Sequence, residues 1–136
     1  MSASPESYVL YADDDDDDRQ FLQYAFEQSV RGQILYTVPG GYELLNFLSE
    51  NVDKIGLPAL IILDQNMPKL SGEEVAALLR QNEKYGKIPI VFFSTSALTL
   101  SAVVGLKIGF EQKPMNLHDW EMITVRLLSH REGQLK

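Results

Sequence analysis

The chain has 136 residues, a hydrophobic fraction of 45% and a formal net charge of −7, which fits a single domain with one core. The acidic balance argues against direct nucleic-acid binding through a basic face, and no apolar stretch is long enough to form a membrane-spanning helix. The absence of cysteine excludes a disulfide framework and thiol chemistry, and it suits a cytoplasmic protein.

The N-terminal segment, residues 1–7, lacks the basic region and apolar core of a signal peptide. We expect it to be a mobile lead-in to one domain that accounts for residues 1–136, with no output domain. An apolar run at 8–12 predicts the first strand. Six consecutive aspartates follow that strand. Because Asp is favoured at helix N-caps and in first turns, a helix is expected from about 16 to 28.

The six aspartates do not all have the same interpretation. A run of carboxylates at the start of a helix is usually a solvated acidic loop, and we interpret Asp15 to Asp18 in that way. Asp13 and Asp14 differ from the others because they directly follow the end of a strand. They are therefore candidates for a site at the sheet edge.

The remaining elements alternate between strand and helix patterns. Strands are predicted at 34–38, 60–63, 90–93 and 108–112, and helices at 42–50, from 72 after a capping-box pattern, at 97–107 and from 117 to about 130. In the helix that begins at 72, Leu78 is one of the apolar residues at helical spacing, and in the last helix Leu117 is another. Five β-α repeats predict a parallel sheet with helices on both faces and right-handed crossovers.

The third strand leads directly into a carboxylate. Residues 60–63 are an unbroken aliphatic run, typical of a strand buried on both faces. Asp64 follows at once, and Pro68 ends any further pairing. Asp64 is therefore expected at the C-terminal edge of a central strand, where open α/β sheets bind their ligands.

Chemically useful side chains follow four of the five predicted strands. They are Asp13 and Asp14 after the first, Asp64 after the third, Ser94 after the fourth and Lys113 after the fifth. In a parallel sheet these groups share one edge. Clustered carboxylates without His or Cys favour Mg²⁺, Mn²⁺ or Ca²⁺, and an added ammonium and hydroxyl suit phosphoryl transfer with a carboxylate nucleophile, here Asp64.

At this point the sequence resembles the receiver domain of two-component response regulators, over about residues 8–130. The residues that carry the resemblance are Asp13-Asp14, the segment 64–68, Ser94 after an aliphatic strand, and Lys113-Pro114. The resemblance implies an α/β fold, namely a three-layer (βα)5 doubly wound five-stranded parallel sheet of order 2-1-3-4-5, which is flavodoxin-like. It also implies a stand-alone receiver of the chemotaxis type.

The resemblance implies a role for each acidic residue. Asp64 is the phosphoacceptor and takes a phosphoryl group from a histidine kinase or a histidine phosphotransfer protein. Asp14, Asp64 and the backbone carbonyl of Asn66 bind Mg²⁺, while Asp13 acts mainly through a metal-bound water. The protein is then not an enzyme in the usual sense, because it catalyses only its own phosphorylation and dephosphorylation.

The resemblance also implies a switch. Ser94 moves to hydrogen-bond the phosphoryl group, Lys113 pairs with it, and Phe110 matches the aromatic switch position, although it can equally be an ordinary core residue. The change is expected to be read by an unknown downstream protein, with no direct role for nucleic acid or membrane.

One segment departs from the family pattern. Ser94 and Lys113 are 19 residues apart, which is fewer than is usual in the family, so the helix between them should be short or irregular. Residues 97–106 contain no charge. This apolar segment either packs onto the sheet or belongs to an exposed face, residues 97–128, through which the chain forms a homodimer or binds a partner.

Other functions fit the motifs less well. A phosphatase of the haloacid dehalogenase type requires Thr or Val where Asp17 stands, an EF-hand requires Gly at Asp18, and no phosphate-binding loop or dinucleotide fingerprint is present. A flavin phosphate would be repelled by the aspartates. The alternative that stays open is a degenerate receiver that acts as a constitutive interaction module.

Overall fold

The computed structural model describes residues 7–30, 32–95, 105 and 107–133. The strands are β1 (Tyr8–Ala12), β2 (Ile34–Val38), β3 (Leu60–Leu63), β4 (Ile90–Ser94) and β5 (Gly109–Gln112), and the helices are α1 (Asp16–Ser29), α2 (Gly41–Ile55), α3 (Gly72–Gln81), α5 (His118–Leu128) and α6 (His130–Gly133).

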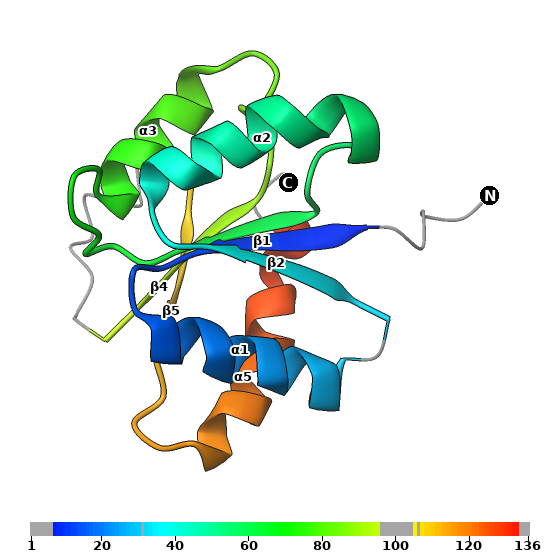
Figure 1. Cartoon of the computed structure of the whole chain (residues 1–136), viewed down its shortest axis with the longest axis vertical. Coiled ribbons are helices and arrows are strands. Elements are labelled where there is room, and N and C mark those ends of the chain that lie inside the picture. Colours follow the sequence, from blue (N-terminus) through cyan, green and yellow to red (C-terminus); the bar gives the residue numbers. More distant parts are fainter. Residues whose placement is uncertain (1–6, 31, 96–104, 106, 134–136) are drawn as a thin grey trace.

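The five strands form one parallel sheet in the order β2-β1-β3-β4-β5. Figure 1 shows α2 and α3 on one face of the sheet and α1 and α5 on the other. The predicted α/β doubly wound architecture and its strand order are therefore confirmed. Because β1 connects to β2 on one side and β3 connects to β4 on the other, the C-terminal ends of the neighbouring strands β1 and β3 form the crevice in which such folds bind ligands.

Two apolar layers hold the helices against the sheet, since successive side chains of a strand point to opposite faces. Leu10, Ile61 and Phe92 pack beneath α2 and α3. Val9 and Ile62 pack on the opposite face, beneath α1 and α5. The three central strands are buried along their whole length, which explains why their sequences are apolar on both faces and predict strands of a parallel sheet.

Local hydrogen bonds from side chains to the backbone determine where α1 and α3 begin. Asp15 caps α1 by accepting a hydrogen bond from the backbone N–H of Asp18. Ser71 and Glu74 form the expected capping box at the start of α3. The N-cap position of α5 is Leu117, which has no capping side chain; one residue earlier, the Asn116 side chain accepts a hydrogen bond from the backbone N–H of Asp119 at 3.2 Å.

Two details of the helices differ from the predictions. α2 runs beyond residue 50 to Ile55, because Val52 extends its buried face. Leu78 and Leu117, which belong to the apolar spacing of α3 and α5, are exposed. Leu117 precedes the first residue of α5, so helical spacing does not place its side chain against the sheet.

Some expectations fall outside the described residues. These are the lead-in over residues 1–6 and the helix expected at 97–107, of which only Gly105 and Lys107 are described. The homodimer face at 97–128 is therefore described only in its C-terminal part. Within the part of the chain that the structure describes, none of the helices combines the length and the hydrophobicity that a bilayer crossing requires.

Gly72 brings α3 against the end of β3. A Cβ atom built at Gly72 would lie 2.3 Å from the backbone oxygen of Asp64 and 2.9 Å from the Cα of Gln65. The Gly72 N–H donates to the Gln65 carbonyl at 3.0 Å. The glycine is therefore required by close approach of two backbones, and it fixes the loop that carries Asp64.

We expect Gly72→Ala to destabilise the fold by about 1–3 kcal/mol, because the methyl group must displace backbone rather than a flexible side chain. Gly105→Ala is the matched control, since a Cβ at Gly105 meets nothing within 4 Å. Urea unfolding of both variants measures the difference. Equal stability of the two variants would contradict the close packing at Gly72.

Candidate functional site

Backbone hydrogen bonds between neighbouring strands place the predicted site residues at one edge. The N–H of Asp13 donates to Val38 at 3.1 Å, that of Asp64 to Ala12 at 3.0 Å, and that of Lys113 to Ser94 at 2.8 Å. Each of these residues is the first after its strand, and its backbone N–H is hydrogen-bonded to the last residue of a neighbouring strand in the sheet. The parallel register brings together residues that are far apart in the sequence.

The Lys113 ammonium lies among three carboxylates. Its Nζ atom is 2.7 Å from Asp13 Oδ2, 2.7 Å from Asp18 Oδ2 and 3.7 Å from Asp64 Oδ1. The Lys113 side chain is only 6% exposed. Burial lowers the pKa of Lys113, but its hydrogen bonds to Asp13 and Asp18 and the charges of Asp13 and Asp64 outweigh this effect and raise the pKa above its ordinary value. The amine is therefore a fixed positive charge.

Asp13 is fully engaged by protein donors. The Tyr11 hydroxyl donates to Asp13 Oδ2 at 2.5 Å, and the backbone N–H of Asp15 donates to Asp13 Oδ1 at 2.9 Å. Burial, and then the charge of Asp13, raises the pKa of Tyr11 well above its ordinary value, so this hydroxyl stays a donor. Since Lys113 also contacts Asp13, both carboxylate oxygens already have partners.

Asp64 is nearly buried and electrostatically unfavourable when ionised. Burial, and then the charge of Asp13, raises the pKa of Asp64 to about 6, although Lys113 opposes the shift. The backbone N–H of Asn66 points at Asp64 Oδ1 at 3.5 Å. A second positive charge beside Asp64 would therefore be strongly favoured.

The acidic groups are arranged as a possible metal site. Carboxylate oxygens of Asp13, Asp14 and Asp64 all lie within 4.8 Å of one another. Asp14 is exposed, whereas Asp13 and Asp64 are buried. Because the oxygens of Asp13 are already occupied by protein donors, Asp14 and Asp64 are the carboxylates with room for a cation. An all-oxygen donor set of this kind fits a hard divalent cation.

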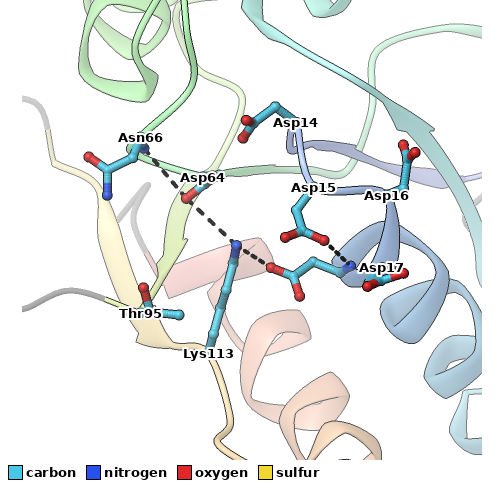
Figure 2. A pocket seen from close by; sticks show the side chains of 9 residues that line it. Asp14, Asp15, Asp16, Asp17, Asp64, Asn66, Thr95 and Lys113 are labelled. Atoms are coloured by element: carbon cyan, nitrogen blue, oxygen red, sulfur yellow. Dashed lines mark hydrogen bonds and ion pairs between the residues drawn. The ribbon is translucent and has the colours of Figure 1, made fainter.

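An open cavity of about 570 Å³ surrounds these groups. It is lined by the aspartates from 14 to 18, by Asp64, Asn66 and Thr95, and by Lys113. Figure 2 shows the Lys113 side chain extending across the cavity toward Asp64, with Asp14 on the far side of Asp64. The nucleophile candidate is thus reached from solvent through a polar opening.

The two predicted switch residues, Ser94 and Phe110, are not among the residues that line the cavity. Ser94 is fully buried at the end of β4, and its backbone carbonyl accepts from Lys113. Thr95, the next residue, lines the cavity. Phe110 is half-buried against the apolar layer beneath α2 and α3 and is paired in register with Phe92. The roles of Ser94 and Phe110 in switching, and of the Asn66 carbonyl as a ligand, stay predictions.

Two members of this network, Asp18 and Tyr11, are not predicted as site residues by the sequence. Asp18 was assigned to a solvated loop, but its carboxylate is only 20% exposed and pairs with Lys113. Its position in the first turn of α1 was a usable signal, because helical side chains lean back toward the N-terminus. Tyr11 was counted only as a strand residue. It lies two positions before Asp13, on the same face of the strand, and its hydroxyl therefore reaches that carboxylate.

Comparison with known proteins gives one family. Residues 9–119 match the sequence model of the response regulator receiver domain. Response regulator Rcp1 of a Synechocystis strain is 30% identical over 96 residues, which cover 69% of this chain and 65% of that protein. The matched segments cover 65%, 35% and 36% of the first three curated relatives.

Solved structures of receivers have the same fold. The Mn²⁺-bound form of Rcp1 aligns with a TM-score of 0.75 at 27% identity, covering 89% of this chain and 94% of that one. The phosphorylated cyanobacterial phytochrome response regulator RcpA aligns with a TM-score of 0.78 at 26% identity, covering 90% and 94%.

Asp64→Asn should stabilise the metal-free chain at neutral pH. Because the pKa of Asp64 in the folded chain lies above the usual value, its contribution to stability is present below about pH 3.9 and is lost as the pH rises through about 6. The neutral amide avoids this loss, so the variant should be more stable by on the order of 2 kcal/mol at about pH 7.5.

Thermal and urea unfolding with a chelator, from about pH 4 to pH 8, measures this gain. The exposed Asp53, which pairs with Lys84 at the surface, provides the control variant Asp53→Asn, for which little change is expected. An Asp64→Asn chain that is less stable than the wild type at neutral pH would show that ionised Asp64 is favourable in the fold.

Proposed function

Because the chain belongs to the response regulator receiver domain family, we propose that it accepts a phosphoryl group on Asp64 from a phosphohistidine of a histidine kinase or histidine phosphotransfer protein. The observation that supports this most directly is the contact of one buried ammonium with Asp13 and its approach to Asp64 within an open acidic cavity. This arrangement pairs an accessible carboxylate nucleophile with a fixed positive charge.

The chemistry is a phosphoryl transfer between two nucleophiles. A carboxylate oxygen of Asp64 forms the new P–O bond while the P–N bond of the phosphohistidine breaks, and the imidazole leaves with the bonding electron pair and takes up a proton. Negative charge spreads over the phosphoryl oxygens during transfer, so stabilisation by fixed positive groups is the main catalytic contribution. Lys113 supplies one such group, held in place by Asp13.

We infer that Asp14 and Asp64, with the backbone carbonyl of Asn66, hold Mg²⁺ in the working protein, while Asp13 contributes through a bound water. A divalent cation at this position neutralises charge on the transferred group. The donor chemistry fits, since two carboxylates plus waters and a phosphate oxygen are a usual Mg²⁺ set. The solved Mn²⁺-bound form of Rcp1 supports the same assignment by analogy.

The proposed output is protein contact rather than turnover of an external substrate. We propose that Ser94 and Phe110 respond to the phosphoryl group and alter the surface near β5 and α5 for a downstream protein in the cytoplasm. Phe110 is only half-buried and packs against the apolar layer beneath α2 and α3, which is compatible with such a role. The protein then catalyses only its own phosphorylation and dephosphorylation.

Incubation with acetyl phosphate and Mg²⁺ should add one phosphoryl group, a mass gain of about 80 Da, to the wild type. The mass gain should vanish when Mg²⁺ is omitted, because the charge on the transferred group is then not neutralised. It should also vanish in Asp64→Asn, because this variant lacks the nucleophile. Intact-mass spectrometry measures it. A folded wild type that gains no mass under any condition would indicate a degenerate receiver that acts as a constitutive interaction module.

Mg²⁺ alone should also stabilise the fold. A cation that binds only the folded chain adds about 2.7 kcal/mol at a hundredfold excess over its dissociation constant. Asp14→Asn should lose most of this gain, because it removes the exposed carboxylate of the cluster, while Asp53→Asn should keep it. Thermal unfolding across a Mg²⁺ titration measures the effect, and a midpoint that does not respond in the wild type would contradict the metal site.

A further inference from the structure

Asp18 reaches the site from outside the acidic cluster of Asp13, Asp14 and Asp64. Its Oδ2 atom is 2.7 Å from Lys113 Nζ, as close as the contact from Asp13, whereas Asp64 Oδ1 is 3.7 Å away. The Lys113 ammonium is therefore hydrogen-bonded to two carboxylates and lies beyond hydrogen-bond distance of the third, which is the phosphoacceptor.

The two carboxylates that hold Lys113 differ in how firmly they are fixed. Asp13 also accepts from the Tyr11 hydroxyl and from the backbone N–H of Asp15. Within the described residues, Lys113 is the sole donor to the Asp18 side chain. Asp18 lies in the first turn of α1, where the positive end of the helix dipole stabilises a carboxylate that loses its partner. The Asp18 contact is therefore the one that can be given up.

We propose that Asp18 is a positioning residue that acts through Lys113: it competes with the phosphoryl group on Asp64 for the ammonium and so limits how readily the site takes up and holds that group. This inference rests on the proposed function of Asp64 as phosphoacceptor. A phosphoryl group brings a charge of about −1.5 to −2 toward an ammonium that Asp18 already partly neutralises. Uptake then requires the Lys113–Asp18 contact to be shared or broken.

The chain offers a matched control at the neighbouring position. Asp17 carries the same charge in the same turn of α1 and is exposed, but among the described residues it forms no ion pair with Lys113. Asp17→Asn and Asp18→Asn therefore remove the same charge from the same region. Only the second removes a partner of the ammonium.

Binding of beryllium trifluoride, a phosphoryl mimic that needs no transfer step, tests the competition at saturating Mg²⁺. We expect Asp18→Asn to bind the mimic about tenfold more tightly than the wild type, the change expected when one charge-assisted hydrogen bond stops competing. Asp17→Asn should change the affinity by at most about twofold, because salt screens an exposed charge. The initial rate of labelling by acetyl phosphate should rise in the same order.

Two further measurements separate positioning from a general charge effect. The ¹⁵N shift of the Lys113 ammonium should change in Asp18→Asn and stay unchanged in Asp17→Asn. In a Lys113→Gln background, Asp18→Asn and Asp17→Asn should have the same effect on the affinity for the mimic, because the ammonium for which Asp18 competes has been removed. Circular dichroism confirms that each variant is folded.

The outcomes are distinguishable from those of the proposed function. If the wild type takes up phosphate and the two Asn variants bind the mimic equally well, or Asp18→Asn binds it more weakly, the inference is overturned and the function stands. If the wild type takes up neither phosphate nor the mimic, the proposed function is overturned and the inference falls with it.

Discussion

The buried ion pair between Lys113 and Asp13 is the interaction on which the site depends. Moving charges out of water is costly, and removing one partner of such a pair leaves the other uncompensated. Asp13 is fully buried and Lys113 is almost so, and neither position would be tolerable alone. Because the two residues follow β1 and β5, which are separated in the sheet by β3 and β4, the pair requires these four strands to be paired in register. The site is therefore a product of the complete topology.

The fold was readable because its determinants are local and repetitive. The apolar runs of β1 and β3 have no alternation of apolar and polar residues, and strands of this kind belong in the middle of a parallel sheet. A parallel sheet in turn places Asp13, Asp64 and Lys113 at one edge, whatever the details of the helices. The end of α2 was less readable, because Val52 joins the buried face only through tertiary packing against the sheet. Propensity does not determine how far such a helix continues.

The parts of the site that sequence reasoning missed are side-chain contacts. The first-turn signal is shared by Asp16, Asp17 and Asp18, so it does not identify which carboxylate meets an ammonium 95 residues away. That choice depends on the angle at which α1 leaves β1 and on the reach of Lys113 from β5. The orientation of Ser94 and Thr95 likewise depends on the tertiary structure. Their order along the chain is plain, but which of the two faces the cavity is decided by the direction of β4 at its last residue.

The site is held in an unfavourable electrostatic state, and this state gives it its specificity. Three carboxylates, those of Asp13, Asp18 and Asp64, surround the Lys113 ammonium, and burial together with the charge of Asp13 raises the pKa of Asp64. Such an arrangement gains most from a small, hard cation and would repel a bare anion. Under the proposed function, arrival of a phosphoryl group would be favourable only together with such a cation and with movement of the Lys113 ammonium. Because Lys113 is bonded through its backbone to β4 and through its side chain to α1, the position of this one charge is tied both to the sheet and to the helix that covers one of its faces.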